Sequence, residues 1–206
     1  NLETVRKNIE DAAARAGRKS DEIAIMAITK THPADAVIAA QKAGMMLFGE
    51  NRVQEGAEKF SRIPRPFRLE LVGHLQRNKA KQAAESFHAV QSIDKIETLS
   101  VLDKFLQMAG RTMDILIEVN TSGEDSKSGC RNDSDLFRLV EEAALFHSIT
   151  LRGLMTIGPL GGDEKEIRKA FRSLKSLQEG CKRRFPGFSW DTLSMGMSGD
   201  YEIAVE

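Results

Sequence analysis

Apolar positions along the chain follow two different spacings. Short and nearly continuous apolar runs, such as residues 22–30 (EIAIMAITK), alternate with longer segments in which apolar residues recur every three or four positions. The first spacing is typical of a buried parallel strand and the second of an amphipathic helix. An initial helix is predicted over residues 2–16, before the first strand, because Gly17 ends its apolar stripe.

The rest of the chain repeats this strand–helix alternation seven times. Turn and cap residues bound the units, for example Pro33 and Gly44 around the first helix that follows a strand. The predicted strands are 22–30, 46–50, 68–74, 89–93, 113–120, 151–157 and 193–197, and the helices that follow them are 33–44, 53–60, 78–86, 96–109, 133–146, 164–184 and one that begins near Asp200. Such alternation predicts right-handed βαβ units in a parallel sheet.

Two α/β architectures have this pattern. Seven units after an extra N-terminal helix fit a TIM-type (β/α)8 barrel whose last β/α unit is not present in this sequence, and a doubly wound open sheet is the alternative. The barrel is favoured because polar side chains recur at the carboxyl ends of the strands, which converge on one mouth in a barrel. They are Lys30, Asn51, His74, Asp94, Asn120, Thr156 and Ser198. No linker divides residues 1–206, so a single domain is predicted.

Charge and composition exclude several classes of function. The 30 Lys and Arg residues balance the 30 Asp and Glu residues, so no overall field would attract nucleic acid. No apolar run approaches the ~20 residues that span a bilayer, and the start of the chain is not typical of a signal peptide. Cys130 and Cys181 lie far apart without metal-ligand spacing. We therefore expect a cytoplasmic protein with reduced thiols, no metal and no membrane partner.

Lys30 is the first candidate for chemistry. Eight mostly apolar residues precede it, and residues 31–33 (THP) turn the chain into a helix. Partial desolvation at that position would favour the neutral amine, which is the nucleophile that forms a Schiff base with an aldehyde. On position alone, a solvated lysine that merely ends the strand is the more common case.

The segment 193–200 (LSMGMSGD) is the second candidate. Gly196, Ser198 and Gly199 allow the backbone to approach a ligand closely, and the helix that follows presents free N–H groups. A strand, a short Gly/Ser turn and a helix N-terminus together predict a phosphate site, although an ordinary capped turn has the same pattern. The carboxylate of Asp200 would repel a phosphate unless it faces away, for example by capping the helix.

Asn51 follows the second strand, in the segment 48–55 (FGENRVQE). A buried amide is costly without a partner, so Asn51 at a barrel mouth is a candidate for orienting a ligand. The neighbouring Glu50 and Glu55 have a plainer explanation, which is ion pairing with Arg52 or Lys59.

Two other strand ends carry weaker signals. His74 ends the third strand, where its imidazole could stack on an aromatic ligand, but a lone histidine is more often structural. The polar segment 123–129 (GEDSKSG) is most simply a mobile loop, and Lys127 within it gives a second amine for a lid or transfer site. The chain contains no HExxH, paired CxxC, GxSxG, Walker or GxGxxG motif.

Taken together, these segments resemble the pyridoxal 5′-phosphate (PLP) homeostasis proteins, which are PLP-binding proteins related to the alanine racemase barrel. The resemblance rests on six motifs in the same order as in the family, across almost the whole chain. They are AITKTHP at 27–33, FGENRVQE at 48–55, LVGHLQRNK at 71–79, SGEDSKSG at 122–129, GLMTIG at 153–158 and LSMGMSGD at 193–200. The resemblance implies that Lys30 holds PLP as a Schiff base. It further implies that Gly196, Met197 and Ser198 hold the phosphate, and that Asn51 and His74 lie around the ring.

The chain departs from the family pattern at two places. The family usually continues into a final strand with an Arg-Ile-Gly-Thr-like sequence, which this chain does not contain, so its phosphate and ring-nitrogen contacts are not assigned. Position 52 is Arg where the family often has Tyr.

The resemblance implies a carrier rather than an enzyme. Related racemases take a second base, a tyrosine, from a separate β domain, whereas the one tyrosine here, Tyr201, lies beyond the predicted phosphate turn. With one lysine and no opposed base, proton transfer at Cα lacks half its machinery. We therefore expect a monomeric protein of PLP and amino-acid homeostasis, with PLP-dependent apo-enzymes as recipients. A PLP-dependent racemase or lyase is the first alternative, and a barrel that binds another phosphorylated metabolite is the second.

Overall fold

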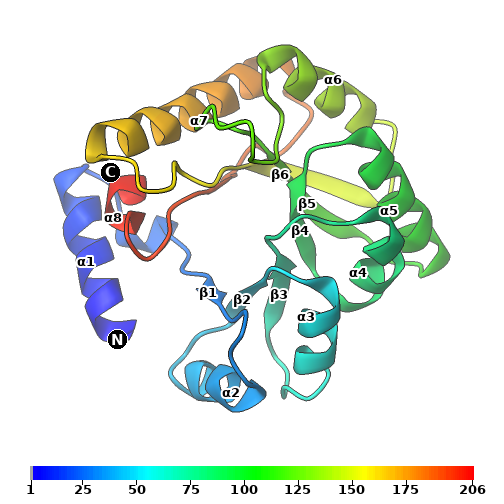
Figure 1. The fold of residues 1–206 in the computed structure, drawn as a ribbon, viewed down its shortest axis with the longest axis horizontal. Coiled ribbons are helices and arrows are strands. Elements are labelled where there is room, and N and C mark those ends of the chain that lie inside the picture. The colour runs from blue at the N-terminus through cyan, green and yellow to red at the C-terminus, as the bar shows by residue number, and fades with distance from the viewer. Residues whose placement is uncertain (1) are drawn as a thin grey trace.

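Seven parallel strands form one sheet, in which each strand pairs with its neighbours in the order of the chain. This arrangement is seen in a computed structural model, which describes residues 2–206. Figure 1 shows the strands at the centre with the helices around them. The strands are β1 (Ala27–Ile28), β2 (Leu47–Glu50), β3 (Arg68–Leu71), β4 (Ala89–Ile93), β5 (Met113–Glu118), β6 (Ile149–Met155) and β7 (Thr192–Ser194). The predicted TIM-type architecture is confirmed: the seven parallel strands form a curled sheet that makes up part of a barrel.

Helices follow the strands where the apolar spacing predicts them. The helices predicted over residues 53–60 and 164–184 agree with the structure at both ends, and so does the strand predicted over 89–93. Asp163 and Glu166 form a reciprocal capping box at the start of the longest helix, which explains its sharp beginning. The helices are α1 (Leu2–Arg15), α2 (Ala34–Lys42), α3 (Val53–Phe60), α4 (Ala80–Ser86), α5 (Ile96–Met108), α6 (Asp133–Ala143), α7 (Glu164–Arg184) and α8 (Tyr201–Val205), with short 3-10 turns at Ser20–Glu22 and Arg77–Lys79.

The first and last helices of the described chain lie side by side, since α1 packs against α8 (Figure 1). Arg15 of α1 donates a hydrogen bond to the Glu206 carboxylate over 2.8 Å. Asn8 donates from its side-chain amide to the Tyr201 hydroxyl over 2.9 Å. The extra N-terminal helix therefore covers the last helix of the described chain. No helix within residues 2–206 is long and apolar enough to span a bilayer.

The first strand is much shorter than predicted. The sequence predicts a strand buried on both faces over residues 22–30, whereas β1 has two residues and Ile28 is 42% exposed. The reason is its place in the sheet: among residues 2–206, β1 pairs with β2 alone, and it therefore has one covered edge. An apolar run alone cannot show whether a strand lies at the centre or at the end of a sheet.

Polar side chains link β3, β4 and the distant β7 across the curled sheet. Gln91 of β4 donates from Nε2 to Glu70 Oε2 of β3 over 2.5 Å. Its Oε1 accepts a hydrogen bond from Ser194 Oγ of β7 over 2.6 Å. Glu70 and Gln91 are both buried, so this relay satisfies polar groups that water does not reach.

Replacing Gly153 with alanine should destabilise the protein by about 1–3 kcal/mol. A Cβ at this position of β6 would lie 1.8 Å from the Thr192 carbonyl oxygen of β7, so the two strands would have to move apart. The matched control is Gly180→Ala on α7, where a Cβ meets nothing within 4 Å and should stabilise the helix by about 0.5–1 kcal/mol. Urea unfolding followed by circular dichroism measures both changes. An unfolding midpoint of Gly153→Ala at or above the wild-type value would contradict this packing.

Candidate functional site

The carboxyl ends of the seven strands lie along one rim, because neighbouring strands are all parallel. Three of the polar residues predicted there hold the loop that follows β5. Thr156 Oγ1 donates to the Val119 carbonyl over 2.7 Å, and Asn120 Nδ2 donates to the Glu124 carbonyl over 2.8 Å. Asp94 accepts from the Gly129 backbone N–H at 3.4 Å. These side chains therefore organise the protein's own backbone.

The other four predicted strand-end residues have side chains without a hydrogen-bond partner within the described part of the chain. They are Lys30, Asn51, His74 and Ser198. Asn51 is half-buried, and the other three are exposed. The rim thus divides into residues that hold a loop and residues left free to contact a ligand.

Lys30 lies in a turn directly after β1. Its side chain is exposed, so the desolvation that the apolar run suggested is not found. The residue that follows it, Thr31, adopts a positive φ of 65°, which is uncommon for a β-branched residue. The amine is therefore presented to solvent on a turn of unusual backbone conformation.

Three charged side chains lie against this turn, and we call them the Glu50–Glu55–Lys59 cluster. Lys59 Nζ donates to Glu50 Oε1 over 2.7 Å and to Glu55 Oε1 over 3.1 Å. The Lys59 side chain is 8% exposed and that of Glu50 is fully buried. Of the two cations predicted as partners for these acids, Lys59 is confirmed, while Arg52 makes no such pair in the described structure.

The ends of β2 and β3 approach each other closely at Gly73. A Cβ on Gly73 would lie 2.2 Å from the Asn51 carbonyl oxygen, so only glycine fits there. Ser92 Oγ of β4 donates to the Gly73 carbonyl over 2.7 Å. This close contact fixes the backbone beside both Asn51 and His74.

His74 lines a hollow of about 420 Å³ outside the strand ends. The buried Leu75 and residues at the start of α5 also line it. Its remaining lining residues are Arg77, Lys95, Glu97 and Thr98. His74 is therefore reached from solvent at the rim.

The predicted phosphate turn connects β7 to α8. Gly196 has a φ of 88°, and a Cβ there would lie 2.8 Å from the Ala204 Cβ. The Asp200 carboxylate does not cap the helix; it accepts a hydrogen bond from the Met197 backbone N–H. The backbone N–H groups of Ser198 and Gly199 have no acceptor among residues 2–206. The turn thus offers two free backbone N–H groups, whereas the N–H group of Met197 already donates to Asp200.

Lys127, the second amine that the sequence suggested, is held by the protein. Its Nζ donates to the Gly158 carbonyl over 2.7 Å and lies 2.6 Å from Glu124 Oε1. The same ammonium group lowers the pKa of Glu124. The amine therefore ties the loop after β5 to the end of β6.

One buried acid, Glu118, is not among the residues that the sequence singles out, whereas the half-buried Asp94 beside it is. Burial, reinforced by the nearby charge of Asp94, raises the pKa of Glu118 to about 7. Asp94 Oδ1 is buried and has no hydrogen-bond partner in the described structure. Burial is also the main reason that the pKa of the Cys130 thiol rises to about 12. The one sequence signal for Glu118 is a carboxylate inside the apolar run of β5.

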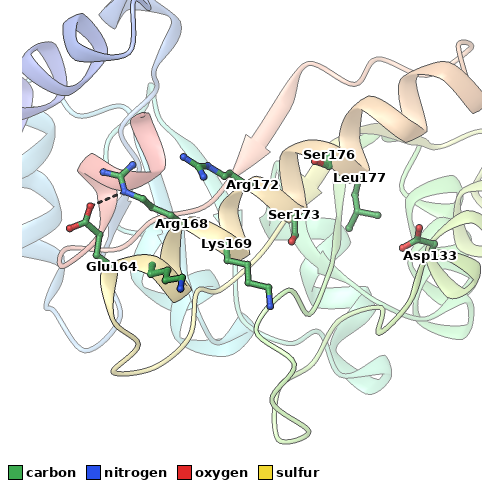
Figure 2. Close-up of a pocket in the computed structure, with 9 residues that line it drawn as sticks. Asp133, Glu164, Arg168, Lys169, Arg172, Ser173, Ser176 and Leu177 are labelled. Carbon is green, nitrogen blue, oxygen red and sulfur yellow. Dashed lines mark hydrogen bonds and ion pairs between the residues drawn. The ribbon is translucent and has the colours of Figure 1, made fainter.

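A larger hollow lies away from these residues, along the outer face of α7. Figure 2 shows it between α7 and the start of α6, with Arg168, Lys169 and Arg172 projecting from the helix. Its volume is about 920 Å³, and none of the predicted site residues lines it. Although this hollow is the larger of the two, the candidate site lies at the strand ends.

Almost the whole chain is similar to known proteins. The model of the alanine racemase N-terminal domain family matches residues 1–205. The chain belongs to this family. Among its relatives is the pyridoxal phosphate homeostasis protein of Vibrio cholerae, which is 38% identical over 211 residues, covering 100% of this chain and 88% of that protein. The resemblance inferred from the motifs is therefore confirmed.

Solved structures of the family agree with the fold. The structure of PipY from Synechococcus elongatus with PLP bound has a TM-score of 0.83 at 30% identity, covering 96% of this chain and 92% of that chain. An alanine racemase from Clostridium difficile has a TM-score of 0.76 at 14% identity, covering 97% of this chain and 51% of that one. The second likeness concerns the fold alone.

Proposed function

We propose that this family member binds PLP at the rim of strand ends and takes part in intracellular PLP (vitamin B6) and amino-acid homeostasis. In this proposal Lys30 holds the aldehyde of PLP as a Schiff base, and the protein has no catalytic turnover. One observation carries the proposal. Lys30 is an exposed amine on a braced turn, and the same rim holds Asn51, His74 and Ser198 with free side chains.

The residues at the rim fit the chemical groups of PLP. The Lys30 amine is accessible to an aldehyde, and the backbone N–H groups of Ser198 and Gly199 are free donors for a phosphate. Asn51 and His74 have free polar atoms for the ring and its substituents. When bound, PLP supplies a reactive aldehyde and an electron-withdrawing ring. The homeostasis proteins among the relatives and the PLP-bound PipY structure support this assignment.

Carriage rather than catalysis is supported by the surroundings of Lys30. A racemase needs a second proton-transfer group opposite the lysine. Tyr201 is the one tyrosine of the chain, and its hydroxyl accepts a hydrogen bond from Asn8 of α1. Because Lys30 is exposed, an aldehyde held there would stay accessible to the amine of a recipient. We propose PLP-dependent apo-enzymes as the recipients and a monomer as the carrier.

Borohydride reduction tests the Lys30 assignment directly. The protein is incubated with PLP, reduced, digested and analysed by mass spectrometry, and we expect one pyridoxyl group on the peptide that contains Lys30. An adduct on Lys127 instead would overturn the assignment. No adduct at all, with binding of PLP retained, would favour a non-covalent phosphate site.

Deuterium exchange separates the carrier from a PLP-dependent racemase or lyase. The PLP-loaded protein is incubated in D2O with a panel of amino acids, and exchange at Cα is followed by proton NMR. We expect no exchange above that given by free PLP at the same concentration. Exchange at enzymatic rates that disappears in Lys30→Ala would overturn the carrier proposal.

A further inference from the structure

The turn that carries Lys30 is held on its N-terminal side by Thr29. The Thr29 carbonyl accepts a hydrogen bond from Lys59 Nζ over 2.6 Å. Its hydroxyl donates to Glu50 Oε1 over 2.7 Å. Because Glu50 and Lys59 are shielded from water, these charge-assisted bonds are stronger than they would be at the surface.

The other side of the turn is held by Thr31. Its backbone N–H donates to Glu55 Oε1 over 2.7 Å, and this bond is the main reason that the pKa of Glu55 is lowered. The positive φ of Thr31 is unfavourable for a β-branched residue, and such a conformation persists only where its surroundings impose it. Glu55 supplies the acceptor that this conformation requires, and Lys59 holds Glu55 in turn.

We propose that Glu55 and Lys59 are positioning residues for Lys30. They fix the residues immediately before and after it, so that the amine is presented toward the rim before PLP arrives. This inference rests on the function proposed above, in which Lys30 is the anchor. A preorganised turn strengthens binding because less conformational entropy is lost when the ligand binds.

Glu55 gives the sharper test of this proposal. Replacing Lys59 would leave the buried Glu50 carboxylate without its cation, which endangers the fold itself. The Glu55 side chain is 30% exposed, so we expect the fold to survive its replacement. Glu55→Ala removes the acceptor for the Thr31 N–H, whereas Glu55→Gln keeps an acceptor oxygen without the charge. Glu58→Ala is the matched control, since Glu58 lies on the same helix and pairs only with the exposed Arg62.

Two measurements are made on each variant. Hydrogen exchange reports the protection of the Thr31 amide, and titration with PLP gives the dissociation constant. In Glu55→Ala we expect exchange at Thr31 and the dissociation constant each to rise roughly tenfold, as for the loss of a hydrogen bond to a charged group. Glu55→Gln should restore most of both values, and Glu58→Ala should match the wild type.

The outcomes distinguish this proposal from the one on which it rests. Wild-type affinity and Thr31 protection in Glu55→Ala would overturn the positioning role, and so would equal losses in Glu55→Ala and Glu55→Gln. Failure of the wild-type protein to form an adduct on Lys30 would overturn the proposed anchor instead. The Thr31 exchange measurement is made without PLP, so it tests the bracing of the turn in either case.

Discussion

In the Lys30→Ala variant we expect PLP to form no covalent adduct, and the visible absorbance of its Schiff base to disappear. One reason is that the second amine suggested by the sequence, that of Lys127, is engaged by Gly158 and Glu124. Lys30 is exposed and has no hydrogen-bond partner in the described structure, so its removal should change stability by less than about 0.5 kcal/mol. Loss of the band would therefore report chemistry and not unfolding.

The matched control for this variant is Lys42→Ala, at the exposed end of α2. Absorbance spectra and borohydride adducts are compared for the wild type and both variants, and Lys42→Ala should behave as the wild type. A band of unchanged intensity in Lys30→Ala would refute the assignment and make Lys127→Ala the next variant to examine. Residual PLP binding without absorbance would instead measure the non-covalent contribution of the phosphate turn.

The Glu118→Gln variant should be more stable than the wild type at pH 8, by about 3 kcal/mol. In the folded protein the pKa of Glu118 is raised from 4.5 to about 7. Between these values the folded state holds a proton that the unfolded state has released. The free energy of unfolding therefore falls as pH rises from about 4.5 to about 7, and it stays lower above that range. Glutamine keeps the neutral shape and cannot ionise, so it removes this loss.

Urea unfolding at several pH values between 4 and 8 tests this expectation. The control is Glu85→Gln on the exposed side of α4, which makes the same change in composition at the surface. Its stability profile should run parallel to that of the wild type, whereas the Glu118→Gln profile should rise away from it as pH increases. Parallel profiles for all three proteins would show that Glu118 is ionised in the fold at neutral pH.

The architecture could be predicted from the sequence because its signals are local. The long helix α7 is an example, since an amphipathic stripe and a capping box at Asp163 and Glu166 define it within one stretch of chain. The two-residue β1 could not be predicted, because its exposure follows from having β2 as its single neighbour in the sheet. The place of a strand in the sheet is a property of the whole fold.

The same division applies to the candidate site. Lys30, Asn51, His74 and Ser198 could be selected because each ends a strand, and parallel strands bring their ends to one rim. Their free side chains could not be distinguished in advance from those of Asn120 and Thr156, which bond to the backbone of their own loop. That distinction depends on where loop carbonyl groups lie in three dimensions. Sequence alone also does not reveal that Lys59 reaches the Thr29 carbonyl, 30 positions away.

The relay from Glu70 through Gln91 to Ser194 has a consequence for the width of the mouth. Ser194 lies two positions before Gly196 of the predicted phosphate turn, and Glu70 lies four positions before His74. β3 and β7 are not neighbours in the described sheet, so no backbone pairing joins these two strands directly. The side chains of Glu70, Gln91 and Ser194 therefore help to set the distance between the predicted phosphate turn and His74. A substitution at Gln91 would thus alter the distance between two predicted ligand contacts without changing either of them.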